Sequence, residues 1–469
     1  MRTLIALAAV LTATAAGAAP AESWQARGDR LLAGAVAIPS VDGKVGARPV
    51  AELLAQEFLK AGFAADDVRV LPYDKTAALM VRLRAAKPKR GAVLLLGHMD
   101  VVEALRTDWT RDPFTLTTEG RYYYGRGTGD MKGGLVSQAI ALMRLRADRV
   151  PLDRDIILFA TGDEEDIGEG AAKIVGEWRS LHNAVIALNA DGGGGSIDRS
   201  GKALGFRLQT SEKTYASYTF TARNRGGHSS RPRPDNAIYA LAQSLDRLAA
   251  YRFTPMLNET VKAYLENAAG TRPAPLAAAM RAFAGNANDI AAADVIEASE
   301  GEIGMIRTTC VATLLNGGHA ENALAQTATA TINCRIFPGV APEQVQVELA
   351  KVAGPDVQVA MLNKFGDGTL PSPLTREIVD AYTKAVHARH PGVPVIPEMT
   401  PGATDGGRLR ANGIPTYGVD GLWRVDPDDM RAHGADERIL IEAFHADLDH
   451  WYDLIRAIGT PSPKAAGKK

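Results

Sequence analysis

The chain has 469 residues, enough for two or three domains with real hydrophobic cores. Its hydrophobic content of 46% and charged content of 23% are ordinary for a globular protein and exclude wholesale disorder. The formal net charge of −1 provides no large basic field, so we expect neither nucleic acid nor an anionic membrane as a partner.

Residues 1–21 have the pattern of a secretory signal peptide. Met1-Arg2-Thr3 carries one positive charge, Leu4 to Ala19 carries none, and small residues follow. This stretch is short for a membrane span, although an uncleaved anchor helix is an alternative. We therefore expect an exported protein, periplasmic or extracellular, without a membrane partner once the signal is removed. Residues 461–469 are expected to form a flexible tail.

The next part of the chain alternates between predicted strands and helices. Short, continuously apolar runs at 92–97, 155–161 and 184–190 predict parallel strands buried on both faces, with helices at 131–147 and 170–180. Residues 366–460 again show the pattern of alternating predicted strands and helices. We therefore predict an α/β catalytic domain with a mixed sheet, formed by residues 22–212 and 366–460.

Residues 213–365 have a different order of elements. A strand at 215–222, a helix at 236–250, two strands across 306–337, a helix at 342–353 and a strand at 356–362 give the order β-α-β-β-α-β. This order predicts a ferredoxin-like domain inserted into the first. An Ala-rich, helical insertion is expected within it, at about 257–300.

The two cysteines fall in the paired strands of this inserted domain. If the strands form a hairpin folded near residue 322, Cys310 and Cys334 lie opposite each other, within disulfide range. An oxidising compartment would allow the bond to form. Two buried free thiols are the alternative.

Acidic and histidine residues follow the three buried strands of the first domain. His98 and Asp100 end the first, Asp163-Glu164-Glu165 ends the second, and Asp191 follows the third. Ligands of open α/β sheets bind beyond the carboxyl ends of such strands. Converging carboxylates would repel one another unless a cation held them, so these residues predict a metal site.

A glycine-rich segment, 125–134, carries another carboxylate. Asp130 could be an N-cap of the following helix, and the glycines could suggest a phosphate cradle, but no Gly-x-x-x-x-Gly-Lys-Ser/Thr motif occurs. A metal-bridging carboxylate explains so contorted a loop better. His433, far downstream, begins His433-Gly434-Ala435-Asp436-Glu437 and is a further candidate ligand.

Taken together, these motifs resemble the co-catalytic zinc metallopeptidases related to glutamate carboxypeptidase, aminoacylase and succinyl-diaminopimelate desuccinylase. The resemblance covers nearly the whole chain after the signal, including Gly227-His228-Ser229-Ser230. The enlarged segment near 257–300 is closer to carboxypeptidase S and the N-fatty-acyl-amino-acid hydrolases. The resemblance implies two Zn²⁺ ions, for which Co²⁺ or Mn²⁺ could substitute, and a homodimer formed through the inserted domain.

The resemblance also implies roles for residues of the catalytic domain. Asp130 would bridge the two zinc ions, one held by His98 and Asp191 and the other by Glu165 and His433. Glu164 would be the general base, and Asp100 would orient His98.

The remaining expected roles concern the substrate. His228 would reach the oxyanion, in this family often from the partner subunit, although it could instead cap a turn. Asn322 and Arg335 would grip a substrate carboxylate, with an exposed structural ion pair as the alternative for Arg335. Gly402 and Thr404 lie in a segment that resembles the family's substrate loop.

We therefore expect a secreted dinuclear zinc hydrolase that cleaves a peptide or N-acyl amide bond next to a free carboxylate. It would be a carboxypeptidase, a dipeptidase or an N-acyl-amino-acid amidohydrolase. A catalytically silent receptor or scaffold domain is one alternative, but it would not need a free base beside the metals. A two-metal phosphoesterase is the other, because an arginine also suits phosphate.

Overall fold

The structure, a computed structural model, describes residues 22–461 apart from 167, 300 and 365–367. The expected signal peptide and all but the first residue of the expected tail lie outside the described residues. Within the described part of the chain, none of the helices has the length and apolarity needed to cross a membrane.

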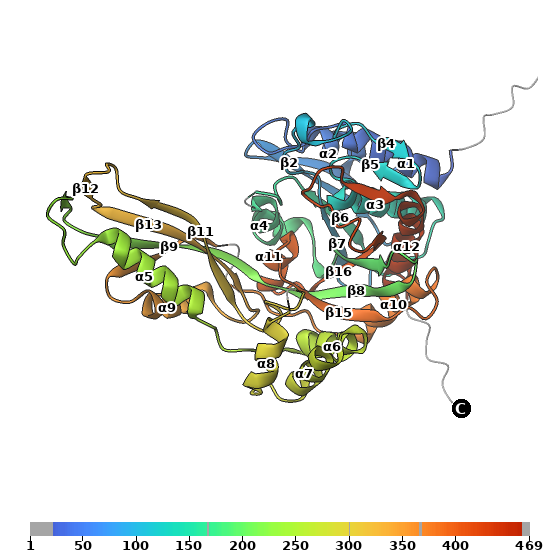
Figure 1. The fold of residues 1–469 in the computed structure, drawn as a ribbon. Helices are drawn as coiled ribbons and strands as arrows, with labels where there is room; N and C mark the ends of the chain where they lie inside the picture. Colours follow the sequence, from blue (N-terminus) through green and yellow to red (C-terminus); the bar gives the residue numbers. More distant parts are fainter. Residues whose placement is uncertain (1–21, 167, 300, 365–367, 462–469) are drawn as a thin grey trace, which may run out of the picture.

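A large mixed sheet forms the centre of the catalytic domain (Figure 1). Its inner strands β6 (Ile156–Thr161), β3 (Ala92–His98), β7 (Ala184–Ile197) and β16 (Thr416–Val425) run parallel. Every residue of β3 and β6 is buried, which is why both are continuously apolar in the sequence. The outer strands are β1 (Val68–Tyr73) and β2 (Thr76–Leu83) on one side, and β8 (Ala203–Glu212) and β15 (Val395–Thr400) on the other.

Helices cover both faces of this sheet. Leu95 of β3 packs in a core with α1 (Trp24–Val36), α2 (Arg48–Lys60), α3 (Gly133–Ala147), α10 (Arg376–His387) and α12 (Ile441–Gly459). Its neighbours Leu94 and Leu96 point the other way, toward α4 (Glu169–Val175) and α11 (Asp405–Ala411). The expected α/β class is confirmed.

Strand β7 is longer than the sequence indicated. We expected it to end at residue 190, before the glycine run, but it continues through Gly192–Gly195 to Ile197. Glycine is required there by close contacts with the backbone, since a Cβ on Gly193, whose φ is +89°, would lie 2.7 Å from the backbone oxygen of Gly418. Asp191 therefore lies within a strand rather than beyond its end.

A small sheet joins two distant parts of the chain. Strand β17 (Arg438–Leu440) pairs with β5 (Tyr122–Tyr124), which pairs with β4 (Thr117–Glu119). This pairing places the segment that follows His433 beside the glycine-rich segment that leads to Asp130.

The inserted domain without its helical insertion, called the lid below, has the expected β-α-β-β-α-β order: β9 (Thr214–Arg223), α5 (Ala237–Ala250), β11 (Thr309–Gly317), β13 (Thr327–Ile336), α9 (Pro342–Ala353) and β14 (Val357–Lys364). Its sheet has the order β11-β13-β9-β14, and α5 and α9 cover one face. Cys310 lies opposite Cys334 in the register of β11 and β13, and the two form a disulfide. At the far tip, β10 (Gly227–His228) pairs with β12 (Ala323–Leu324).

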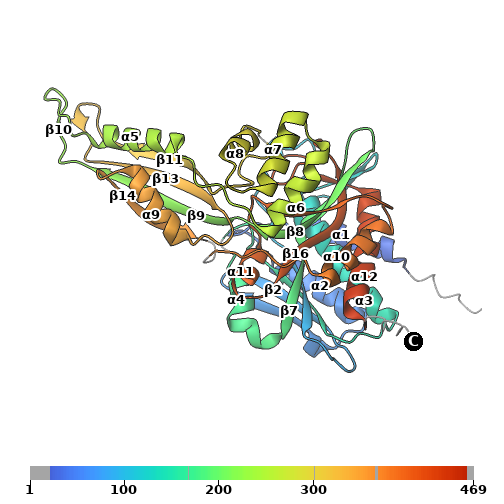
Figure 2. The ribbon, with the colours of Figure 1, turned by 90° about the horizontal axis from the view of Figure 1, so that it is seen from below.

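The helical insertion packs on the catalytic domain. Helices α6 (Glu259–Ala268), α7 (Ala274–Gly285) and α8 (Ile290–Glu297) share a hydrophobic core with Met399 of β15. A hydrogen bond of 2.6 Å joins the hydroxyl groups of Thr260 and Thr210. Figure 2 shows the three helices beside the large sheet, while the lid extends away from it.

Candidate active site

The parallel strands bring the predicted ligands to one edge of the sheet. His98, the last residue of β3, pairs in register with Thr161, the last residue of β6. Glu164 and Glu165 follow three and four residues later, and Asp191 comes from β7 on the other side of β3. Three segments separated in sequence therefore converge.

Two groups of possible ligands share one carboxylate. The ligand atoms of His98, Asp130 and Asp191 lie within 4.8 Å of one another, and so do those of Asp130, Glu165 and His433. Oδ1 of Asp130 lies 3.2 Å from Nε2 of His98, and Oδ2 lies 3.2 Å from Nε2 of His433. Each oxygen of Asp130 thus faces a different group, which is the arrangement of a bridging carboxylate. The structure brings together all five expected ligands.

The three consecutive acids after β6 have three different environments. Asp163 points away from the ligands, because its carboxylate accepts hydrogen bonds from Tyr73 Oη and from the backbone N–H groups of Glu169 and Gly170 at the start of α4. Glu165 Oε2 lies 2.9 Å from His433 Nε2. Glu164 lines the cavity beside both ligand groups but belongs to neither.

Asp100 is fully buried behind His98. Nδ1 of His98 lies 3.1 Å from the backbone oxygen of Asp100 and 3.5 Å from its carboxylate, so Nε2 is the nitrogen directed at Asp130. The other carboxylate oxygen accepts a hydrogen bond of 2.9 Å from the backbone N–H of Glu165. Asp100 thus connects one ligand from each group.

The electrostatics of the cluster are strongly perturbed. Burial, reinforced by the charge of Asp191, raises the pKa of Glu164 well above its usual range. Burial also raises the pKa of Asp191. Burial alone would raise the pKa of Asp130, but hydrogen bonds from His433 and His98 outweigh it and lower that pKa. Hydrogen bonds to Asp130 and Glu165 raise the pKa of His433 to about 10.

This donor set fits a pair of divalent cations. Three carboxylates and two imidazoles converge with Nε2 of each histidine directed at the shared Asp130, and nitrogen and oxygen donors suit zinc, cobalt or manganese. Positive charge at this position would compensate carboxylates that burial otherwise holds toward their neutral forms.

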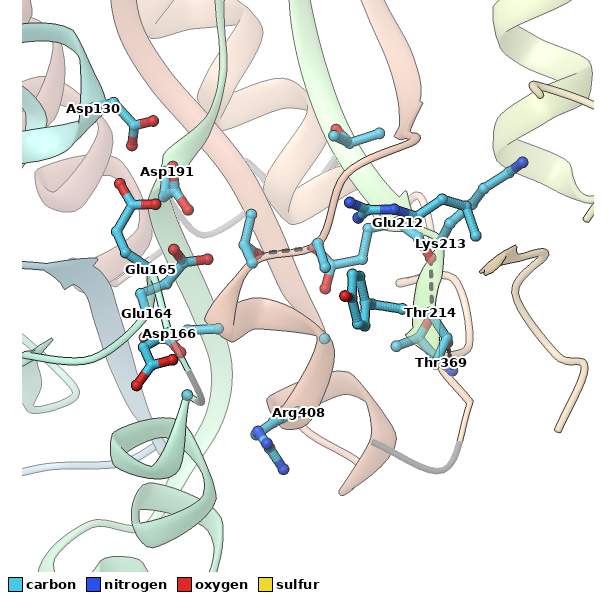
Figure 3. Close-up of a pocket in the computed structure, with 18 of the residues that line it drawn as sticks. Asp130, Glu164, Glu165, Asp166, Asp191, Glu212, Lys213, Thr214, Thr369 and Arg408 are labelled. Carbon is cyan, nitrogen blue, oxygen red and sulfur yellow. Dashed lines mark hydrogen bonds between the residues drawn. The ribbon is translucent and has the colours of Figure 1, made fainter. Parts of the chain in front are cut away.

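A cavity of about 470 Å³ lies between the ligands and the root of the lid. Figure 3 shows Asp130, Glu164, Glu165 and Asp191 on one side, with Glu212, Thr214 and Thr369 across from them. Arg335 also lines the cavity, with its guanidinium 4.9 Å from the centre of the Tyr215 ring. Burial lowers the pKa of Arg335, and none of the described carboxylates pairs with it. The structural ion pair considered for Arg335 is therefore absent from the described part of the chain.

The predicted substrate loop contributes differently from expectation. Ala403 and Thr404 are among the described residues that line the cavity, whereas Gly402 is not. Thr404 caps α11: its hydroxyl accepts a hydrogen bond from the N–H of Gly406 and donates to Glu212 Oε2 at 2.9 Å. These bonds indicate that Thr404 shapes the cavity wall.

His228 and Asn322 lie at the tip of the lid, away from this cavity. Neither is among the described residues that line it, and the N–H of Ser229 donates to the backbone oxygen of Asn322 at 3.0 Å. The ten-residue strand β9, which starts beside the cavity at Thr214, carries the chain roughly 33 Å away before His228 is reached. Nδ1 of His228 lies 2.8 Å from Oγ of Ser230, in the local turn that the alternative interpretation expected. Within one chain, Asn322 and Arg335 therefore do not form a joint carboxylate site.

Three further features of the site were missed by sequence reasoning. Asp405, at the start of α11, is buried beside the cavity and shares a hydrogen bond with Thr161, and burial raises its pKa to about 7. Glu212 forms a buried ion pair with Arg410. Glu437 binds the backbone of the segment that carries Asp130. The sequence signal that could have identified these residues is that each is an acidic residue next to a predicted strand end or helix start.

Comparisons with known proteins agree with this site. Residues 94–457 match the model of Peptidase family M20/M25/M40. The chain is 25% identical over 378 residues to carboxypeptidase S-like 2 of Dictyostelium discoideum, covering 78% of this chain and 71% of the relative. It is 27% identical over 406 residues to the N-fatty-acyl-amino acid synthase/hydrolase PM20D1 of Homo sapiens, covering 81% and 76%.

A solved structure shows the same fold. The M20 family metallo-carboxypeptidase Sso-CP2 of Sulfolobus solfataricus superposes with a TM-score of 0.70 at 18% identity, covering 92% of this chain and 99% of that chain. The matched family region includes all five ligands, Glu164 and the whole lid. The expected family and the expectation of a metal-dependent hydrolytic enzyme are confirmed: the chain belongs to Peptidase family M20/M25/M40.

Proposed function

We propose that this protein is a dinuclear zinc hydrolase that cleaves a peptide or N-acyl amide bond next to a free carboxylate. Its substrates would be those of a carboxypeptidase, a dipeptidase or an N-acyl-amino-acid amidohydrolase. One observation carries the proposal: Asp130 is shared between two ligand groups in a cavity that also holds the non-ligand Glu164 and Arg335, with which none of the described carboxylates pairs.

Glu164 is the proton carrier of this proposal. A bound pair of divalent cations would polarise the amide carbonyl and lower the pKa of a water molecule. Glu164 accepts a proton from the attacking water at its carboxylate and delivers it to the leaving nitrogen. Its burial suits this role, because a raised pKa makes the carboxylate a stronger base toward the proton of the attacking water.

Arg335 is the proposed anchor for the substrate's carboxylate. Its guanidinium is partly buried and lies over Tyr215, so pairing with an anion would offset its desolvation. A planar guanidinium binds a carboxylate through two parallel hydrogen bonds, which also orients the scissile amide.

We also propose a homodimer formed through the lid, with His228 supplied to the cavity of the partner. Strand β11 is an edge of the lid sheet, and Val311, Leu314 and Leu315 along it are 58%, 68% and 72% exposed. A long apolar edge strand is a template for pairing with a second chain. A partner would bring in a second lid tip, and His228 lies too far from the metal ligands of its own chain to act on them.

Export to the periplasm or the extracellular space is proposed from two features. Residues 4–19 are uncharged and follow one arginine, as in a signal peptide. The disulfide between Cys310 and Cys334 is typical of oxidising compartments.

The function is tested with protein stripped of metal by a chelator and dialysed. Zn²⁺, Co²⁺ or Mn²⁺ is returned separately, and hydrolysis is measured for N-acyl amino acids, dipeptides, their C-terminally amidated counterparts and phosphate esters. We expect metal-dependent cleavage of amides that carry a free carboxylate. Hydrolysis of phosphate esters alone would favour a phosphoesterase, and amide cleavage without any bound metal would reject the proposal.

A further inference from the structure

Glu437 is almost fully buried, at 1% exposure, four residues after the expected ligand His433. It immediately precedes β17, whose pairing with β5 places it beside the glycine-rich segment. A carboxylate buried this deeply needs compensating hydrogen bonds, and residues 126–130 supply them.

Both oxygens of Glu437 are occupied by the segment that carries Asp130. Oε2 accepts hydrogen bonds from Arg126 Nη1 at 2.7 Å and from the N–H of Gly127 at 3.0 Å. Oε1 accepts from the N–H groups of Gly129 at 2.7 Å and of Asp130 itself at 3.0 Å. With two donors on each oxygen, one from the Arg126 side chain and three from backbone N–H groups, this carboxylate is fully hydrogen-bonded and is not a ligand.

The same contacts also hold the turn that carries His433. Arg126 donates from Nη1 to Glu437 and from Nη2 to the backbone oxygen of Gly434 at 3.1 Å. The backbone of Glu437 continues this connection, since its oxygen accepts from the N–H of Gly125 at 3.0 Å. One buried pair, Arg126 and Glu437, therefore fixes the two segments that supply Asp130 and His433.

We infer that Glu437 is a positioning residue that sets the distance between Asp130 and His433 and thereby creates the second of the two cation sites. The inference rests on the proposed metal pair. The second group consists of Asp130, Glu165 and His433, so two of its three members depend on Glu437. In the first group only Asp130 does, because His98 and Asp191 come from strands β3 and β7.

The substitution Glu437→Gln tests this selectivity. A glutamine has the same shape, but its NH₂ group cannot accept hydrogen bonds from N–H donors. The hydrogen bonds accepted by one of the two carboxylate oxygens are therefore lost. Wild-type and variant proteins are stripped of metal and titrated with Co²⁺, following heat of binding and the visible absorption of bound cobalt, and the metal content is measured after dialysis. Glu442→Gln, an exposed residue that pairs with Arg121, is the matched control.

We expect the wild type and the control to bind two equivalents of Co²⁺. The Glu437→Gln protein should keep one tight equivalent and bind the second roughly 10–100-fold more weakly, the usual effect of removing a residue that orients ligands. Two equivalents bound as tightly as in the wild type, or equal weakening of both, would overturn the inference. If the wild type itself binds no metal, the proposed function fails instead.

Arg126→Lys keeps the inference testable if the Glu437→Gln protein does not fold. Lysine retains the positive charge but cannot reach both Glu437 and Gly434. The same selective weakening of the second equivalent is expected, to a smaller extent. Unchanged binding of both equivalents by Arg126→Lys would contradict the role of this pair.

Discussion

Nη1 of Arg410 lies 3.0 Å from Oε2 of Glu212, and each side chain is only 1% exposed. Glu212 is the last residue of β8, directly before the chain enters the lid. Its Oε2 also accepts from the Thr404 hydroxyl, which in turn accepts from Asn189 Nδ2 at 3.2 Å. Asn189 Oδ1 accepts from the N–H of Asp191 at 3.0 Å, so a chain of polar contacts connects the root of the lid with a metal ligand.

Glu212→Gln should strongly destabilise the protein. It leaves the guanidinium of Arg410 buried without its counter-ion, which typically costs about 3–5 kcal/mol of unfolding free energy. Glu52→Gln is the control, because Glu52 pairs with Arg48 at an exposed site and should change stability by less than about 1 kcal/mol. Urea unfolding monitored by circular dichroism measures both. Equal, small effects would show that the buried pair contributes no more than the surface pair.

Glu164→Gln should separate catalysis from metal binding. The residue belongs to neither ligand group, so metal content should be unchanged while turnover falls by about 10²–10⁴-fold. Glu165→Gln should instead lower the metal content, because Glu165 is a member of the second group. Elemental analysis and steady-state kinetics distinguish the two variants. Wild-type turnover by Glu164→Gln would refute its role as the base.

Arg335→Met should affect only substrates with a free carboxylate. Removing a hydrogen-bonding charge of this kind costs about 1.5–3 kcal/mol, which is roughly a 10–100-fold loss in kcat/KM. Substrates with an amidated C-terminus should be cleaved as by the wild type. Arg223→Met is the control. Arg223 is exposed and lies on the same face of strand β9 as Tyr215. An equal loss on both substrate types would remove the proposed role of Arg335.

His450 should make the protein sensitive to acid. Its ring is buried, Nε2 lies 2.9 Å from the backbone oxygen of Val419, and burial lowers its pKa from 6.5 to about 4. Between these values the unfolded chain binds a proton that the folded protein does not, so stability falls as the pH drops from 6.5 to 4, by about 3 kcal/mol in total. In His450→Gln this contribution is gone. Urea unfolding at about pH 7.5 and about pH 4.5 measures how much more stable the wild type is than the variant. This difference in unfolding free energy should be smaller at the lower pH. An equal difference at both pH values would contradict the assignment.

The proposed dimer should depend on strand β11. Replacing Leu314 and Leu315 by lysine places charges on the exposed edge and should convert a dimer into a monomer by light scattering. Turnover should fall with it if His228 acts across the interface. Leu362→Lys, on the opposite edge strand β14, is the control. Activity regained by mixing His228→Ala and Glu164→Gln chains would identify a shared site, and no regained activity would reject it; wild-type turnover by His228→Ala alone would place His228 outside the reaction.

The ligand cluster could be predicted because its signals are local. Each apolar run ends in residues that metal ions bind, and the carboxyl ends of parallel strands meet at one edge whatever the sequence between them. The β-α-β-β-α-β order of the lid could likewise be read from alternating polarity. In β13 every second residue is buried, from Ala328 to Ile336.

The remaining features depend on contacts between distant segments. Three adjacent acids look alike in the sequence, and only the start of α4 distinguishes Asp163 as a helix-capping residue. The glycines of β7 suggested the end of a strand, yet close neighbours on strands β8 and β16 require them: a Cβ on Gly193 or Gly194 would lie 2.7 or 2.8 Å from a backbone oxygen of β16. The distance of His228 from the metal ligands follows from the orientation of the whole lid, which no local pattern specifies.

The position of α6, α7 and α8 affects how far the lid can move. The chain passes between lid and body at both ends of this insertion as well as at both ends of the lid itself. The N–H of Met256 donates to the oxygen of Ile306 at 2.7 Å, and the ammonium of Lys213 donates to the oxygen of Arg307 at 2.5 Å. Three of these four crossing segments are thus hydrogen-bonded to one another. We therefore expect the lid and the helical insertion to move as coupled parts rather than independently.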